Sequence, residues 1–397
     1  MTPAPKKTLL LGLLMLLQCT APVLAKDGKT GYTGDVKTTV KDVGCTRSED
    51  STMDNLYPKT CIAGPPDGGL RCWWTHVPAA VKSDASLKVP LVIDMHGGGL
   101  CAHHEALASG FKQVSDSLGG NTFIVAWPQG YDYQWGTCGS DCDKAKTANA
   151  GKNAGKAIAS QDDLTFLTNL VAYMVKNQAA ANPAKGRVDP ERVYSTGFSM
   201  GCMMSHRLAM ERSNIVAAFG CHGGQLIGHY NLTEQKKQYG IQPTAAYMTG
   251  GTEDHWFNSF DSMDAWATFA GGCASEMTNT TVELPRVFVE KTGSYKPTNA
   301  TLRVRSSCGS STPAVEVARL EIAGAGHVMD NRMANLTWQF LKKYKRAGAL
   351  AAPPASPNAT AAAASPSNKS AAAATNQTAA RGLLLLAVVV LAAAVVY

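Results

Sequence analysis

Residues 193–204, VYSTGFSMGCMM, decide the fold of this chain. They begin with a short β-type run, pass through Gly197, Ser199 and Gly201, and continue into a helix-like run. A turn this tight holds the serine in a strained backbone conformation and leaves no room for a β-carbon at either glycine. A strand, a sharp turn and a helix in this order are typical of a nucleophile elbow. The alternative is a turn that only connects two core elements.

Apolar runs on both sides of this turn predict a sheet of mostly parallel strands. Residues 89–95, VPLVIDM, suit a strand that is covered on both faces. Residues 164–175 repeat apolar side chains at helical spacing, and the order of strand, helix and strand recurs. We therefore expect an α/β fold with a mostly parallel central sheet and helices on both faces. Further strands, some with the loop that follows, are expected at 70–78, 121–130, 214–220, 244–254 and 315–322, and a last helix at 330–344.

Three residues follow the chain order of an α/β-hydrolase triad, which is nucleophile, acid and histidine. Ser199, Asp254 and His327 each come at the carboxyl end of an expected strand, where this fold places its site. A serine hydroxyl is a weak nucleophile, so His327 is expected to take the proton of Ser199. Asp254 is expected to hold the tautomer of His327 and to stabilise its imidazolium form.

Other acids and histidines are alternatives for these roles. Asp261 and Asp264 lie within a helix-like run, whereas Asp254 lies in a glycine-rich loop. His222 and His255 lie at strand ends comparable to that of the expected catalytic histidine. Each of these two histidines is therefore a substitute for it or a contact for substrate.

The run at residues 96–99, HGGG, is typical of an oxyanion loop. Glycines let backbone N–H groups approach a substrate oxygen with no side chain in the way. We expect the N–H groups of Met200 and of Gly98, or of a neighbouring glycine, to bind the developing oxyanion. His96 is expected to support this loop rather than to transfer a proton.

Aromatic side chains after two strands are candidates for substrate contact. Tyr131, Tyr133 and Trp135 follow one strand, and loops at the carboxyl ends of parallel strands line the ligand crevice. The alternative is that this loop packs beneath its own cysteines. Trp256, which follows the expected acid, is a second candidate, together with His222.

The ends of the chain read as targeting segments. Residues 1–25 combine Lys6 and Lys7, an apolar run at 9–17 and a small-residue cleavage site, which predicts a secretory signal peptide. Residues 383–397 are wholly apolar but shorter than the roughly 20 residues of a spanning helix. Small residues and a polar spacer precede them, so they match a glycosylphosphatidylinositol attachment signal better than a transmembrane helix.

Composition divides the chain between these ends. Residues 26–69 are polar and are expected to be a loosely structured arm that a disulfide ties down, and residues 70–346 are expected to form the α/β-hydrolase domain. Residues 347–382 are rich in Ala, Ser, Pro and Thr and predict a disordered stalk. The chain is therefore expected to be secreted and tethered to the plasma membrane. Glycosylation sequons that suit surface positions of the domain occur at Asn231, Asn279, Asn299 and Asn335.

Cysteine usage indicates disulfides rather than a metal site. Ten of the eleven cysteines lie after the signal peptide, and an even count in an exported chain favours pairing. Cys202 follows the elbow, and we expect it to pair, with Cys221 as the candidate partner. There is no C-x-x-C pair, and the adjacent His103 and His104 point in different directions, so no metal or cofactor is expected.

The net charge of +7 does not indicate a nucleic-acid partner. Seven Lys or Arg residues and no acid follow Asp330, and two lysines lie in the signal peptide, which leaves residues 26–330 at −2. A domain near neutrality lacks the basic footprint that phosphate backbones require.

Together these motifs resemble the polyhydroxybutyrate depolymerase / feruloyl esterase family of secreted α/β-hydrolases. The resemblance covers about residues 70–342 and is carried by residues 91–98, 127–130, 162–163, 192–204, 251–254 and 324–327. It implies a triad at Ser199, Asp254 and His327, and substrates such as feruloylated or acetylated polysaccharide or short polyester. It also implies a disulfide between Cys273 and Cys308.

The chain departs from this family at three places, namely at Cys202 after the elbow, at Gly98 in the oxyanion loop and at residues 328–330 after the histidine. These departures bear on the choice of substrate more than on catalysis. The overall prediction is a surface-tethered carboxylic-ester hydrolase that acts on cell-wall polysaccharide or polyester. The alternatives are a catalytically inactive binding protein on the same fold, and a peptidase or lipase.

Overall fold

A computed structural model describes residues 47–64, 69–137, 162–176, 187–227, 242–257, 261–273, 276–309 and 314–346. All of them belong to the first of two units into which the chain divides, Met1–Ala363. The expected signal peptide, stalk and C-terminal signal lie outside the described residues, as does Asn231.

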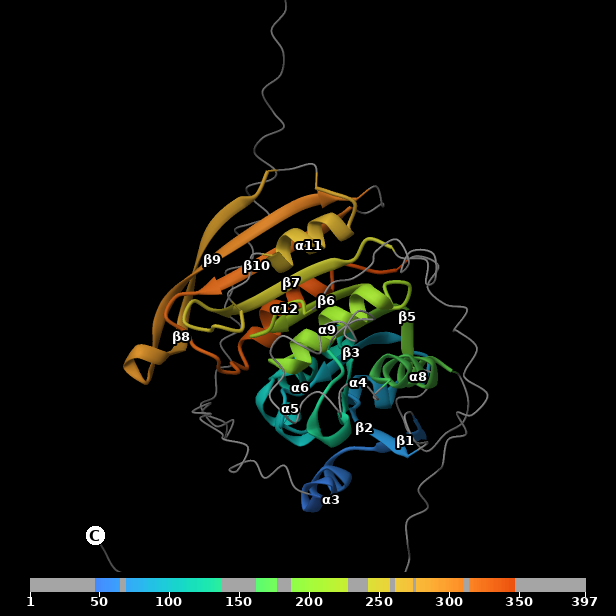
Figure 1. Ribbon diagram of the computed structural model, residues 1–397. Helices are drawn as coiled ribbons and strands as arrows, with labels where there is room; N and C mark the ends of the chain where they lie inside the picture. Colours follow the sequence, from blue (N-terminus) through green and yellow to red (C-terminus); the bar gives the residue numbers. More distant parts are fainter. Residues whose placement is uncertain are drawn as a thin grey trace, which may run out of the picture. The chain divides into compact units, whose positions relative to one another are not determined.

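Ten strands in the described residues form one sheet, in the order β1-β2-β4-β3-β5-β6-β7-β10-β9-β8 (Figure 1). The strands are β1 (Lys59–Ala63), β2 (Leu70–His76), β3 (Val89–Met95), β4 (Ile124–Pro128), β5 (Val188–Gly197), β6 (Ala218–His222), β7 (Ala245–Gly251), β8 (Thr278–Val289), β9 (Ser294–Cys308) and β10 (Val315–Ile322). The helices are α3 (Arg47–Leu56), α4 (Ala79–Ser83), α5 (Ala102–Ala108), α6 (Phe111–Ser117), α8 (Asp163–Val175), α9 (Met200–Glu211), α11 (Asp261–Phe269) and α12 (Met333–Leu341), with 3-10 turns η2 (Gly119–Asn121), η3 (Tyr131–Tyr133) and η5 (Glu290–Thr292).

The middle of the sheet is parallel, which confirms the predicted α/β class. Strands β4, β3, β5, β6, β7 and β10 pair in parallel, whereas β1 and β2 at one edge and β8 and β9 at the other pair antiparallel. The central strands β3 and β4 are buried along their whole length, as a parallel sheet covered on both faces requires. This sheet, with a strand–turn–helix nucleophile turn at its centre, is that of an α/β-hydrolase fold.

Helices cover both faces of the sheet. Successive side chains of a strand point to opposite faces, so a strand with apolar side chains throughout must be covered on both. Ser195 of β5 faces α9, where its hydroxyl donates to the carbonyl of Ser205. The next side chain toward the N-terminus, Tyr194, packs its ring against Trp338 of α12, with ring centroids 6.0 Å apart. The nucleophile turn therefore begins in a strand that is fixed from both sides.

The N-terminal region differs from the expected loose arm. Residues 47–63 contain α3 and β1, and β1 pairs with β2 so that Cys61 lies opposite Cys72 and forms a disulfide with it. As a result β2 is not the edge strand. This strand has little signal in the sequence, because β1 is only five residues long and follows a polar helix.

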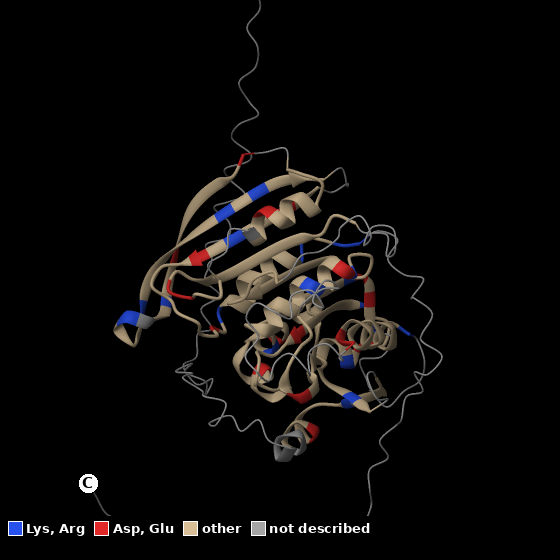
Figure 2. Ribbon diagram, viewed as in Figure 1, with Lys and Arg blue, Asp and Glu red and all other residues tan. Residues whose placement is uncertain are grey.

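The hairpin of β8 and β9 was not predicted at all. Its strands are 12 and 15 residues long, and much of their length is exposed. Figure 2 shows Lys and Arg positions along β9 and β10, with Asp and Glu positions on β10 and α11 beside them. Arg305 pairs with Asp264 of α11 at 2.6 Å, and Arg303 pairs with Glu321 of β10. Polar strands of this kind lack the apolar alternation from which a strand is recognised.

The disulfides and the sequons lie where the sequence suggested. Disulfides join Cys202 to Cys221 and Cys273 to Cys308, and Cys101 is also disulfide-bonded. None of the helices in the described part of the chain is both long and apolar enough to cross a bilayer. Side chains of three sequons are exposed, those of Asn279, Asn299 and Asn335.

Candidate active site

The serine of the nucleophile turn has a backbone conformation that few residues adopt. Ser199 joins β5 to α9 with φ 53° and ψ −116°, and its N–H donates to the carbonyl of His222 at 2.9 Å. A β-carbon at Gly201 would lie 1.9 Å from the carbonyl oxygen of Met95, and one at Gly197 would lie 2.4 Å from it. Strand and helix thus meet too closely for any side chain, as the two glycines predicted.

Three side chains form a continuous hydrogen-bonded chain at this turn. His327 Nε2 lies 2.9 Å from Ser199 Oγ, and His327 Nδ1 lies 2.9 Å from Asp254 Oδ2. The residues come from the ends of β5, β7 and β10, which the parallel sheet brings to one edge. This is the geometry of a nucleophile, a base and an acid that orients the base.

Asp254 is held firmly, and its nearest described rival lies elsewhere. The carboxylate is 2% exposed, and its second oxygen accepts the N–H of Trp256 at 2.9 Å. Asp264 is exposed and pairs with Arg305 on the outer strands. The side chain of Asp261 lies outside the described part of the structure.

His222 neither replaces His327 nor faces substrate, which corrects its prediction as a substrate contact. It is buried, and its Nε2 donates to the carbonyl of Val328 at 2.8 Å. Its Nδ1 lies 2.7 Å from the hydroxyl of Thr249, and burial lowers its pKa. His222 therefore supports the loop that carries His327. The sequence placed it correctly at a strand end but did not show that both ring nitrogens are used internally.

The two residues expected to form the oxyanion hole are neighbours in space. A β-carbon at Gly98 would lie 3.3 Å from Met200 Sδ. Met200 is the first residue of α9, where backbone N–H groups have no carbonyl of the preceding turn to bind. The loop around Gly98 is fixed by bonds from the N–H of Gly99 to the carbonyl of Tyr133 and from Leu100 to Gly97.

His96 supports this loop from inside the protein. It is fully buried, its Nδ1 donates to the carbonyl of Gly97 at 2.8 Å, and its Nε2 accepts the N–H of Gly130 at 2.9 Å. Burial lowers its pKa to about 4. A ring that is neutral and used at both nitrogens is a structural element rather than a base.

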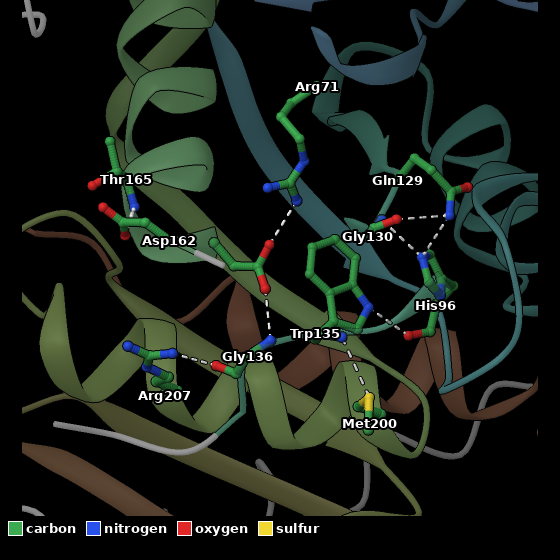
Figure 3. Close-up of polar contacts among 11 residues, drawn as sticks. Arg71, His96, Gln129, Gly130, Trp135, Gly136, Asp162, Thr165, Met200 and Arg207 are labelled. Carbon is green, nitrogen blue, oxygen red and sulfur yellow. Dashed lines mark hydrogen bonds and ion pairs between the residues drawn. The ribbon is translucent and has the colours of Figure 1, made fainter. Parts of the chain in front are cut away.

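The predicted aromatic contacts divide into one buried and one exposed residue. Trp135 is 0% exposed, and its indole N–H donates to the carbonyl of His96 at 2.8 Å (Figure 3). It therefore does not contact substrate, and that prediction is corrected. Trp256 is 45% exposed, lies two residues after Asp254, and packs against the exposed His255 with ring centroids 5.0 Å apart.

Sequence reasoning missed the role of one acid at the start of α8. Asp162 caps the helix by accepting the N–H of Thr165 at 2.9 Å, as a capping pattern predicts. Asp163 points inward instead, is 0% exposed, and pairs with Arg71 of β2 at 2.6 Å. The sequence contains a sign of this second role, because Asp162 and Asp163 are adjacent acids and a helix N-cap needs only one carboxylate.

A pair of buried carboxyl groups lies beneath the nucleophile turn. Asp94 of β3 and Glu105 of α5 are almost fully buried and, with Phe198 and His222, line a cavity of about 20 Å³. Trp127 donates its indole N–H to Asp94 at 3.0 Å. Burial raises the pKa of Asp94 to about 6, and burial and the charge of Asp94 raise the pKa of Glu105 well above its usual range. The folded protein therefore holds protons here at a pH where exposed carboxyl groups have lost theirs.

This pair should make the protein less stable as the pH rises. The unfolded chain releases both protons near about pH 4 and the folded chain only at higher pH, so the stabilisation present below pH 4 is lost through about pH 6 and above. Glu105→Gln removes one of the two titrating groups. Its free energy of unfolding should therefore fall less steeply than that of the wild type between about pH 4 and pH 8, as measured by denaturant titration. The exposed Glu283→Gln variant should keep the wild-type slope, and equal slopes in all three proteins would contradict the assignment.

Comparisons with known proteins point to esterases. No family model matches the chain. A protein named as an esterase, NocK of Nocardia uniformis subsp. tsuyamanensis, is 28% identical over 137 residues, which is 34% of this chain and 33% of NocK. The bifunctional acetylxylan esterase/xylanase XynS20E of Neocallimastix patriciarum is 23% identical over 266 residues, which is 66% of this chain and 32% of that protein. The chain thus spans about a third of the length of these relatives.

Solved structures give a similar set of names. An acetyl xylan esterase from Aspergillus awamori is 14% identical, with a TM-score of 0.46 over 72% of this chain and 99% of that chain. A ferulic acid esterase from Anaeromyces mucronatus is 15% identical, with a TM-score of 0.42 over 72% of this chain and 90% of that chain. The relatives in sequence are named as esterases, whereas the polyhydroxybutyrate depolymerase part of the resemblance stays a prediction. The chain is therefore similar to proteins that are named as esterases.

Proposed function

We propose that this protein is a serine carboxylic-ester hydrolase that acts through an acyl-enzyme. The observation that carries the proposal is the bonded chain from Ser199 Oγ through His327 to Asp254. Together with a serine held at φ 53° between a strand and a helix, it supplies an activated nucleophile at the sheet edge. The names of the relatives agree with this chemistry.

In the first half of the proposed reaction, Ser199 Oγ attacks the ester carbonyl carbon while His327 takes the hydroxyl proton. The negative charge that develops on the carbonyl oxygen is stabilised by the N–H groups of Met200 and Gly98. Loss of one such donor typically costs about 3–4 kcal/mol of transition-state stabilisation. Asp254 stabilises the imidazolium, which then gives its proton to the leaving alcohol.

In the second half, water attacks the acyl-enzyme and His327 serves again as base. The proton passes from water to the imidazole and then back to Ser199 Oγ as the acid is released. Each bond made or broken involves only the ester, water and these side chains. The proposed reaction therefore uses no metal or cofactor.

For the substrate we propose ester groups carried on cell-wall polysaccharide, acetyl or feruloyl in type, with short polyester as the further possibility. The support is the set of relatives named for acetylxylan and ferulic esters. The exposed ring of Trp256 beside the triad suits stacking on a sugar or phenolic ring. We also propose export by residues 1–25, a lipid anchor directed by residues 383–397, and glycosylation at the sequons.

A fluorophosphonate probe tests the catalytic part of this proposal. It should label the wild-type protein, and peptide mapping should place the label on Ser199. Acetyl, feruloyl and 3-hydroxybutyrate esters offered separately should then show which acyl group is turned over. A wild-type protein that takes no label and cleaves none of these esters would favour an inactive hydrolase scaffold that acts by binding.

A further inference from the structure

We propose that Trp135 is a positioning residue that fixes the two halves of the oxyanion hole relative to each other. The inference rests on the proposed function and concerns a residue that does not touch substrate. Trp135 is 0% exposed and lies between the loop that carries Gly98 and the first residue of α9, Met200 (Figure 3). These two segments are far apart in the sequence and become neighbours only when the chain folds.

Trp135 contacts both segments through polar groups. Its indole N–H donates to the carbonyl of His96 at 2.8 Å, two residues before Gly98. Its backbone N–H points at Met200 Sδ at 3.4 Å. Its ring also lies 5.0 Å from that of His96, measured between centroids. Trp135 therefore contacts the loop of Gly98 through its indole N–H and the side chain of Met200 through its backbone N–H, and so links the two segments whose amides the proposed reaction requires to converge on a single oxygen.

The residue that follows Trp135, Gly136, is bonded through both its backbone N–H and its carbonyl. The N–H of Gly136 donates to Asp163 Oδ2 at 2.6 Å, and its carbonyl accepts from Arg207 Nη1. Arg207 is itself oriented by Glu211 one helical turn further along α9, at 2.9 Å. Helices α8 and α9 thus both bond to the backbone of Gly136, and strand β2 holds the α8 carboxylate through Arg71 (Figure 3).

The buried ion pair between Arg71 and Asp163, which orients the carboxylate that binds Gly136, should add little to the free energy of unfolding. Arg71 and Asp163 are 4% and 0% exposed, and Arg71 Nε and Nη1 have no hydrogen-bond partner in the described structure. The guanidinium lies over the ring of Phe166 at 4.3 Å. A buried pair of this kind contributes little net stability compared with apolar packing. We infer that the role of the Arg71 and Asp163 charges is to fix the position of Gly136, and through Gly136 that of Trp135.

Small displacements of an oxyanion donor have large effects on rate. A shift of about 1 Å can lower the rate about 100-fold, because donors must meet the oxygen only as its charge develops. Trp135→Phe keeps the aromatic packing and removes the indole N–H bond to His96. We expect kcat for an activated ester to fall by about 10- to 100-fold, while KM changes by less than about twofold.

The matched control is Trp74→Phe. Trp74 is also buried, at 1% exposed, and its indole N–H also donates to one acceptor, Asp54, at 2.7 Å, but it lies on β2 away from the site. Both variants lose the indole hydrogen bond of a buried tryptophan, so both should lose some thermal stability. Only Trp135→Phe should lower kcat.

Amide hydrogen exchange provides a readout that does not depend on catalysis. Exchange of a peptide containing residues 96–101 should be faster in Trp135→Phe than in the wild type, and unchanged in Trp74→Phe. If the wild type cleaves no ester but this pattern holds, the proposed function fails while the positioning contact stands. If exchange is unchanged, or if it is faster while kcat stays at the wild-type value, Trp135 is not a positioning residue.

Arg207→Lys is the second variant should Trp135→Phe not fold. It withdraws the guanidinium from the carbonyl of Gly136 but keeps a cation for Glu211. We expect a smaller decrease of kcat at constant KM and faster exchange of the same peptide. A change of KM alone would overturn the proposal, because it would show lost substrate contact instead.

Discussion

Ser199→Ala should lower kcat for carboxylic esters by about 10⁵- to 10⁶-fold. The hydroxyl is the only group in the bonded chain that can form the acyl-enzyme, because His327 and Asp254 supply a base and its orientation. Alanine fits the turn without a clash, since it only removes the oxygen. Turnover of a p-nitrophenyl ester measures the effect, and fluorophosphonate labelling should disappear with it.

The structure offers a control for this substitution. Ser117 ends α6 and is exposed, and its hydroxyl donates to the nearby carbonyl of Val114 at 2.7 Å. Ser117→Ala should retain wild-type turnover, and both variants should melt cooperatively. Residual ester hydrolysis near the wild-type rate in a folded Ser199→Ala protein would mean that another residue is the nucleophile.

Asp254→Asn should lower kcat by about 10⁴-fold. The amide is nearly the same size, so it can still accept the N–H of Trp256, which Asp254 binds at 2.9 Å. It cannot stabilise the imidazolium of His327, and it can favour the wrong tautomer of that ring. The loss should therefore appear in kcat, measured at saturating ester, with little change in folding.

Asp264→Asn is the matched control for the acid. Asp264 was the rival in the sequence, and its carboxylate instead pairs with Arg305 at 2.6 Å on the surface. We expect its kcat to equal that of the wild type within about twofold, because an exposed pair contributes little. A large loss in Asp264→Asn together with an active Asp254→Asn variant would reverse the two assignments.

The central sheet was predictable because its signal is local. Strands such as β3 are unbroken apolar runs, and strict close packing at Gly197 and Gly201 can be read from the residues themselves. The outer hairpin was not predictable, because β8 and β9 are exposed and polar and are held by pairing with β10 rather than by burial. The short strand β1 is not predictable for a different reason, because five residues after a polar helix carry too little periodic signal.

The sequence predicted the positions of the candidate triad better than those of the candidate substrate contacts Trp135 and His222. Ser199, Asp254 and His327 follow three parallel strands, and parallel strands bring their carboxyl ends together whatever the rest of the chain does. Trp135 and His222 also follow strands, yet both are buried and hydrogen-bonded inside the protein. Whether a side chain at a strand end faces solvent or core depends on the elements that pack over it.

The sequence by itself determined the fold class, the nucleophile turn and the order of the candidate catalytic residues, because each is expressed in local pattern or chain order. Only the tertiary structure decided which residues support the site from within. The backbone N–H of Gly136 is bonded to Asp163 and its carbonyl to Arg207, 27 and 71 positions away in the chain. Contacts at such separations leave no periodic trace in a sequence, because they arise when distant elements pack together.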